Sequence, residues 1–160
     1  MISTTQFLES IYLPGYMTVL NADYSGNVGL FKFKPAEPPV TILSDRYLTP
    51  RGTHISLSQG GICFVEQMIH EDKLDDLTIE ELRGTTREGR LKLVEFNQRF
   101  RREVGLSDSL QGKMILTKHR SGKIPVVRFD FDLGNRSVIG DFTAVIAPHP
   151  VPQTNTDILR

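Results

Sequence analysis

The longest mostly apolar stretch of the chain runs from Ser56 to His70 and contains no proline. Its apolar residues occupy most of the circumference of a helix, which is typical of a buried helix rather than a surface helix. Gly60 and Gly61 lie near the start of this stretch, where close packing against a sheet would tolerate them. We therefore predict one central helix. Its apolar residues are Leu57, Ile62, Phe64, Val65, Met68 and Ile69.

Apolar and polar residues alternate on both sides of this stretch, and such alternation predicts strands. In the segment Ile124 to Leu133 the apolar residues recur at every second position, so one face would cover the helix. Short turn sequences between the segments favour antiparallel pairing. The predicted fold class is α+β, with an antiparallel sheet wrapped around the central helix. The other predicted strands are Tyr16 to Ala22, Val28 to Lys34, Leu91 to Arg101, Leu110 to Lys118 and Arg136 to Ile146.

Two short helices are predicted outside this core. Apolar residues around Phe7 and Ile11 indicate an opening helix, which Pro14 would end because proline disfavours a helical residue before it. In the charged stretch that follows the central helix, Thr78 and Glu81 have the spacing of a capping box. That spacing predicts a surface helix.

Composition limits the organisation and the partners of the chain. With 160 residues, of which 39% are hydrophobic, we expect one domain over residues 1–150 and a polar tail over 151–160. Nineteen basic and nineteen acidic residues balance, so no long-range field would attract nucleic acid, and no segment is apolar enough to insert into a membrane. The single cysteine, Cys63, excludes an internal disulfide and favours a reducing compartment such as the cytoplasm.

Motifs for metal and nucleotide cofactors are absent from the sequence. There is no Walker loop, dinucleotide fingerprint, paired CxxC or HExxH, and the four histidines are scattered. The sequence GxSxG, which marks a hydrolase nucleophile elbow, is absent too. We therefore expect no cofactor and no metal.

A line of polar residues on the central helix is the most informative candidate site. Gln59, Cys63, Glu66 and His70 are spaced by four, three and four residues, so they share one helical face. Glu66 beside apolar neighbours would lose solvation, which raises a carboxyl pKa and suits it to act as a general base or acid. The alternative is an exposed Glu66 that pairs with His70.

Other residues near the helix add weaker candidates. Free amides of a first turn at Gly60 and Gly61 could hold a carbonyl oxygen as it becomes negative, or the glycines could serve only for close packing. His54, just before the predicted helix, could activate water or could simply be solvated.

A tyrosine and a cluster of arginines complete the candidate site residues that the residues themselves suggest. Tyr47 could donate a hydrogen bond to a reacting carbonyl, although a tyrosine there can also pack its ring and expose its hydroxyl. Arg99, Arg101 and Arg102 form a basic cluster that could meet phosphates, although solvated arginines are common at strand ends.

Several passages of the sequence are similar to one known family. They are Ala22-Asp23-Tyr24-Ser25, Tyr47 followed by Gly52, Cys63-Phe64 with Gln67 nearby, and Arg99-Phe100-Arg101. With the order of elements, they resemble the hotdog superfamily, and most closely the FcoT-like long-chain fatty acyl-CoA thioesterases.

This resemblance implies a substrate and several roles. It implies hydrolysis of a fatty acyl thioester carried by coenzyme A or an acyl-carrier protein, in a homodimer or higher homo-oligomer. Tyr47 matches the catalytic tyrosine of the family, Tyr12 a substrate-contacting tyrosine, and Ser56 a polar position on the helix. Gln59 lies on the helix face that would meet the substrate.

Glu66 resembles the helix carboxylate of other hotdog enzymes, and this leaves the reaction open. Such a carboxylate acts as a base toward water in thioesterases, or with a histidine in 3-hydroxyacyl thioester dehydratases, where His54 would be the partner. The third alternative is an acyl-binding module without catalysis.

Overall fold

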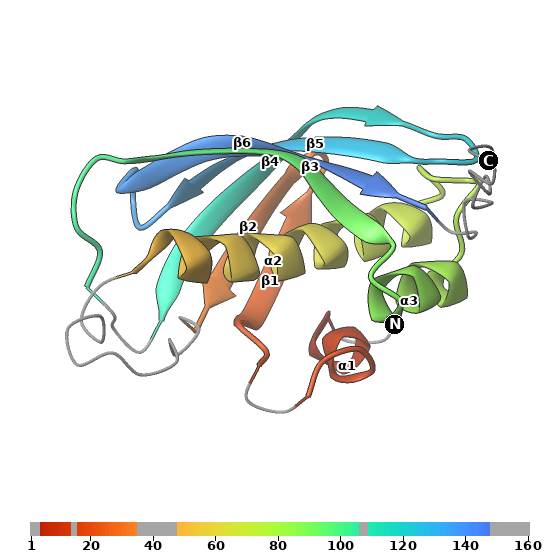
Figure 1. Cartoon of the computed structure of the whole chain (residues 1–160), viewed down its shortest axis with the longest axis horizontal. Helices are drawn as coiled ribbons and strands as arrows, with labels where there is room; N and C mark the ends of the chain where they lie inside the picture. Colours follow the sequence, from red (N-terminus) through yellow and green to blue (C-terminus); the bar gives the residue numbers. More distant parts are fainter. Residues whose placement is uncertain (1–3, 14–15, 35–47, 106–108, 148–160) are drawn as a thin grey trace, which may run out of the picture.

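The computed structural model describes residues 4–13, 16–34, 48–105 and 109–147 (Figure 1). Within these residues three helices and six strands follow one another along the chain. In chain order they are α1 (Thr4–Glu9), β1 (Val19–Ser25), β2 (Val28–Phe33), α2 (Pro50–His70), α3 (Ile79–Arg87), β3 (Leu91–Phe100), β4 (Leu110–Arg120), β5 (Val126–Leu133) and β6 (Val138–Ile146).

The strands form one antiparallel sheet in the order β1-β2-β4-β5-β6-β3. In the described chain β3 is an edge strand, because it pairs only with β6. The sheet covers one side of α2, whereas α1 and α3 lie on the other side (Figure 1). This arrangement confirms the predicted α+β fold with an antiparallel sheet around a central helix.

The core lies between α2 and the concave face of the sheet. On β5, Phe129 is fully buried, and its ring centroid lies 5.1 Å from that of Phe64 on α2 and 5.1 Å from that of Phe142 on β6. Burying one such side chain contributes about 1.5–3 kcal/mol. The alternation predicted for β5 is confirmed, because Val127 and Leu133 are fully buried as well.

α2 begins earlier than the sequence analysis predicted, at Pro50 rather than Ser56. The Thr49 side chain caps the helix by accepting a hydrogen bond from the Gly52 amide at 3.1 Å. Proline is tolerated in the first turn, where no helical carbonyl is available for its nitrogen. His54 therefore lies within α2, and the expectation that it precedes the helix is wrong.

Gly60 and Gly61 consequently lie in the middle of α2, and their predicted place near the helix start is wrong. Their amides belong to the helical ladder, so they cannot polarise a substrate carbonyl. The glycines serve close packing instead: a β-carbon on Gly60 would lie 2.9 Å from the Met114 sulfur, and one on Gly61 3.2 Å from the Phe142 ring.

The other elements follow the prediction with small shifts. β1 begins at Val19 rather than Tyr16, and the α3 capping box between Thr78 and Glu81 is confirmed. Pro14 and the predicted tail over 151–160 lie outside the described residues. Among the helices described, none has both the length and the apolar character needed to cross a membrane.

Candidate functional site

An open groove of about 410 Å³ lies beside α2. α2 forms one wall, the first residues of β3 form another, and residues from α3 and from the turn after α1 complete it. The groove combines an apolar surface with hydroxyl, imidazole and ammonium groups. Its lining residues are Tyr12, His54, Ser58, Ile62, Thr86, Leu91, Lys92 and Leu93.

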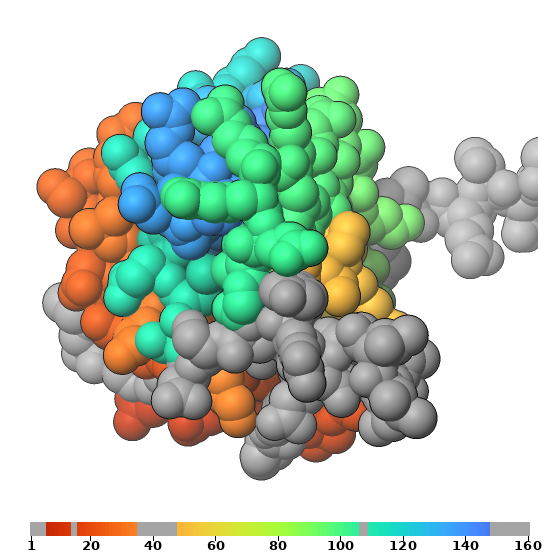
Figure 2. Space-filling model, turned by 90° about the vertical axis from the view of Figure 1, so that its left-hand side faces the viewer, coloured from red at the N-terminus to blue at the C-terminus, as the bar shows by residue number. Residues whose placement is uncertain are grey.

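The α2 wall follows from helical spacing. His54, Ser58 and Ile62 are four residues apart, so they stand one above another on a single face. Ser58 donates its hydroxyl proton to the His54 carbonyl at 2.7 Å. The exposed His54 ring meets the Phe96 ring edge-on, with 5.0 Å between the centroids. Figure 2 shows the start of α2, in yellow-orange, at the surface beside the green residues of β3.

The floor of the groove is apolar and nearly closed. Ser58, Ile62 and two leucines of β3 also line a small apolar cavity behind the groove. That cavity measures about 10 Å³, which is close to the smallest space that holds one water molecule. The remaining lining residues of the cavity come from α2, β5 and β6. They are Gly61, Val65, Val127, Phe129, Phe142, Ala144 and Ile146.

Tyr12 contributes a neutral phenol to the groove. Burial, with a smaller contribution from nearby Cys63, raises the pKa of Tyr12 to about 12. The hydroxyl therefore keeps its proton at neutral pH and is able to donate a hydrogen bond. Tyr12 is the sequence candidate for substrate contact that the structure places in the groove together with His54.

Glu66 is buried, with 4% of its surface exposed. Burial raises the pKa of its carboxyl from about 4.5 to about 7, and the charge of Arg83 opposes that rise. Its Oε1 lies 3.7 Å from Nε2 of His70. The alternative of an exposed Glu66 is therefore wrong, although the pairing with His70 exists. Glu66 is not among the residues that line the groove.

The polar face of α2 is covered rather than open to solvent. Gln59 and Cys63 are each 1% exposed, and only His70 at the end of the helix is exposed. Burial raises the pKa of the Cys63 thiol well above its usual value, and the nearby Glu66 adds to the rise.

Gln59 is occupied by structural contacts. Its Oε1 accepts hydrogen bonds from the Thr18 amide at 2.7 Å and the Thr18 hydroxyl at 3.0 Å, while its Nε2 donates to the Tyr16 carbonyl at 2.7 Å. The side chain thus joins α2 to the segment before β1. Because Gln59 is also 1% exposed, the structure does not present it for the predicted contact with substrate.

Ser56 is buried, and its hydroxyl has no hydrogen-bond partner among the described residues. It is separated from Ser58 by about 200° around the helix, so it faces away from the groove. The structure does not bring Ser56 to the site.

Arg99 lies near the end of β3 that is far from the groove, Arg101 and Arg102 follow just after that end, and all three are exposed. Arg99 lies about 20 Å along the strand from Leu93, at 3.3 Å per residue. These arginines do not meet the groove in one chain. Tyr47 lies outside the described residues.

The proposed pair of His54 and Glu66 is also separated. Twelve residues along one helix correspond to about 18 Å. The two side chains of one chain therefore cannot act on neighbouring atoms of a substrate.

Ser58, Thr86 and Lys92 line the groove and were not predicted. Ser58 has a signal in the sequence, since it stands four residues after His54, but that signal depends on the true start of α2. Thr86 and Lys92 reach the groove only through the packing of α3 and β3, which no local pattern shows. Among the described residues, no group of three or more histidine, cysteine or acidic side chains is arranged to hold a metal ion.

Comparison with known proteins gives matches to structures alone. No family model and no curated protein matches the chain. The structure of a Shewanella oneidensis protein, described as a candidate thioesterase, is similar to this chain. The TM-score is 0.53 and the sequence identity is 12%, over 83% of this chain and 85% of that one.

Two further structures are similar at lower scores. An HP0420 homologue from Helicobacter felis has a TM-score of 0.49 and 10% identity, over 84% of this chain and 80% of that one. A thioesterase superfamily protein from Shewanella loihica has a TM-score of 0.43 and 12% identity, over 82% of this chain and 91% of that one. These two scores are too low to carry an argument, whereas the first match shows the shared fold.

Proposed function

We propose that this chain, which has the hotdog fold, hydrolyses an acyl thioester in the groove beside α2. The observation that carries the proposal is the composition of the groove: an apolar floor for an acyl group, and a histidine, a phenol and an ammonium group around it. The similar Shewanella oneidensis protein is described as a candidate thioesterase, which agrees with this proposal. The acyl carrier would be coenzyme A or an acyl-carrier protein.

The hydrogen-bond pattern supports separate roles for the polar residues of the groove. Ser58 and Thr86 donate their hydroxyl protons to the carbonyls of His54 and Leu82, so Tyr12 and Lys92 supply the donors for a substrate. A phenol that stays neutral is suited to bind the carbonyl oxygen of the substrate by donating a hydrogen bond to it.

His54 is the base that the groove presents to water. In this proposal it takes a proton from water, the water oxygen attacks the thioester carbon, and the carbon–sulfur bond breaks. The proton then passes from His54 to the departing thiolate. Glu66 is the second candidate for the base, because a pKa of about 7 suits that role, but it requires a path from the groove to the buried carboxyl.

The acyl group would lie against Ile62, Leu91 and Leu93. Because the cavity behind them is nearly filled, a long fatty acyl chain would run along the groove or toward a second copy of the protein. Pairing of two copies along β3 would place that second copy beside the groove, since Leu91 and Leu93 belong to this edge strand.

The test is release of free thiol from acyl-coenzyme A and acyl-carrier-protein substrates of graded length. His54→Asn should lower kcat by about 10²–10⁴-fold, the usual contribution of a general base. Glu66→Gln and Tyr47→Phe test the other two candidates, and His119→Asn is the control because His119 is an exposed histidine on β4. Full activity in His54→Asn and Glu66→Gln together would overturn the mechanism.

Two outcomes would replace hydrolysis with another function. Formation of an enoyl product from a 3-hydroxyacyl thioester would indicate a dehydratase, in which Glu66 of a second copy would have to approach His54. Tight binding of an acyl thioester without turnover would indicate an acyl-binding module.

A further inference from the structure

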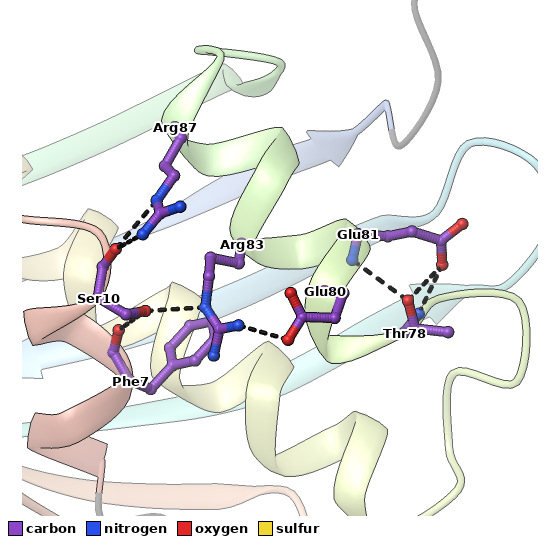
Figure 3. A network of polar contacts seen from close by, with 7 residues as sticks. All are labelled: Phe7, Ser10, Thr78, Glu80, Glu81, Arg83 and Arg87. Atoms are coloured by element: carbon purple, nitrogen blue, oxygen red, sulfur yellow. Dashed lines mark hydrogen bonds and ion pairs between the residues drawn. The ribbon is translucent and has the colours of Figure 1, made fainter.

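Two arginines of α3 hold Ser10, the residue that follows α1 (Figure 3). Arg83 donates a hydrogen bond from Nε to the Ser10 hydroxyl at 2.9 Å, and Arg87 donates from Nε to the Ser10 carbonyl at 3.0 Å. Nη2 of Arg87 donates to the same carbonyl. The Arg83 guanidinium also lies over the Phe7 ring, with its carbon 5.7 Å from the ring centroid.

These contacts fix the end of α1 in a defined place. Phe7 and Leu8 are fully buried, which anchors α1 from its apolar side. The Ser10 carbonyl follows the helix and has no helical partner, so a charged donor satisfies it with a strong hydrogen bond. We call this arrangement of Arg83, Arg87 and Ser10 the arginine clamp.

The arginine clamp lies next to a wall of the groove. Tyr12 follows Ser10 by two residues, and its amide donates to the Leu8 carbonyl at 2.8 Å, so its backbone belongs to the same turn. Its side chain lines the groove together with Thr86, which precedes Arg87 on α3. α3 thus forms one part of the wall directly and holds the neighbouring part through Ser10.

We propose that Arg83 and Arg87 are positioning residues that hold Tyr12 in the wall of the groove, where it contacts the substrate. The proposal rests on the proposed function, because it takes the groove to be the substrate site. Neither arginine is among the residues that line the groove, so their effect on the substrate passes through Ser10 and Tyr12.

Arg87 gives the cleaner variant for a test, because the charge of Arg83 also acts on Glu66. Arg102→Ala is the matched control, because Arg102 makes the same kind of contact elsewhere. It donates hydrogen bonds from Nε to the Ser137 hydroxyl at 2.8 Å and from Nη2 to the Asn135 carbonyl at 2.6 Å. Arg87→Lys keeps a charged donor and should restore most of what Arg87→Ala loses.

The first measurement reports the position of residue 12 without any substrate. The chain contains no tryptophan, so Tyr12→Trp places the only tryptophan of the variant in the groove wall, where its emission can be excited apart from that of the remaining tyrosines. Adding Arg87→Ala should shift its emission to longer wavelength and increase quenching by acrylamide, whereas adding Arg102→Ala should change neither. Unchanged emission in the folded Arg87→Ala protein would overturn the proposal, whether or not the protein hydrolyses thioesters.

The second measurement is kinetic. Arg87→Ala should raise KM for the acyl thioester about tenfold, equivalent to 1.4 kcal/mol of binding, and leave kcat within about twofold, because ground-state binding is lost rather than chemistry. The double variant Tyr12→Ala with Arg87→Ala should have the same KM as Tyr12→Ala alone, because both changes remove the same contact between Tyr12 and the substrate.

The two measurements separate the failure of this proposal from failure of the proposed function. Additive effects on KM in the double variant would overturn the proposal, and so would a shifted emission with an unchanged KM. Absence of thiol release from the wild-type protein counts against the proposed function, while the emission measurement still decides whether the arginine clamp holds residue 12. If Arg87→Ala does not fold, Arg87→Gln, which removes the charge, is compared with Arg102→Gln in the same two measurements.

Discussion

Glu66 shows how burial sets the chemistry of a side chain in this protein. Its carboxyl is covered on the side of α2 that faces away from the sheet, and the charge of Arg83 only partly offsets the loss of solvation. The sequence was sufficient to predict this loss, because Ile62, Val65 and Ile69 flank Glu66 on the helix. It was not sufficient to show that the carboxyl would be covered rather than open to a groove.

Replacing Glu66 with glutamine should change how stability depends on pH. The pKa of Glu66 is raised in the folded protein, so between pH 4.5 and 7 the folded state keeps a proton that the unfolded chain releases. The free energy of unfolding should therefore fall over this range as pH rises. At about 1.4 kcal/mol per pKa unit, the fall is on the order of 2–3 kcal/mol.

Chemical denaturation of wild type and Glu66→Gln at pH 5 and pH 8 measures this effect. Glu66→Gln should lose most of the dependence, whereas Glu103→Gln, at an exposed position, should retain it. An identical pH dependence in wild type and Glu66→Gln would contradict the assignment.

At the scale of elements, α2 and β1 show where a linear pattern fails. The apolar pattern of α2 starts at Ser56, but the helix starts at Pro50, because capping by Thr49 and a proline in the first turn suffice to begin it. β1 starts late because the backbone at Tyr16 and Thr18 hydrogen-bonds to the Gln59 side chain. Such a contact joins residues far apart in sequence, so no local rule predicts it.

Removing the Gln59 side chain should therefore destabilise the protein strongly. Gln59→Ala leaves the Thr18 amide and the Tyr16 carbonyl without their partner, which should cost about 2–6 kcal/mol, given 1–3 kcal/mol for each buried unsatisfied group. Gln67→Ala is the control on the same helix, because Gln67 bonds only to the Glu71 side chain at an exposed position. Equal unfolding free energies for the two variants in denaturant titrations would refute this role.

At the scale of the whole molecule, the sheet leaves β3 as an unpaired edge in the described chain. The order of the strands followed from no single segment of sequence, whereas their number and their antiparallel pairing did follow from alternation and short turns. The groove could not be predicted at all as a unit. Tyr12, His54, Thr86 and Lys92 come from separate parts of the chain, and only the packing of the helices and β3 brings them together.

A dimer through β3 should depend on residues along that edge. Val94 is 56% exposed on β3, so Val94→Asp should produce monomers by placing a charge in the shared edge. Leu30→Asp, at a position 54% exposed on β2, should leave the oligomeric state unchanged. Sedimentation of the three proteins measures this, and a wild-type monomer would contradict pairing along β3.

The burial of Cys63 makes local opening of the structure detectable by chemical labelling. Its thiol is the only one in the chain, it is 1% exposed, and it lies close to Tyr12 and Glu66. An alkylating reagent can reach it only when the cover on that side of α2 opens. The labelling rate of this one native atom thus reports on those openings, and no residue of the protein has to be changed.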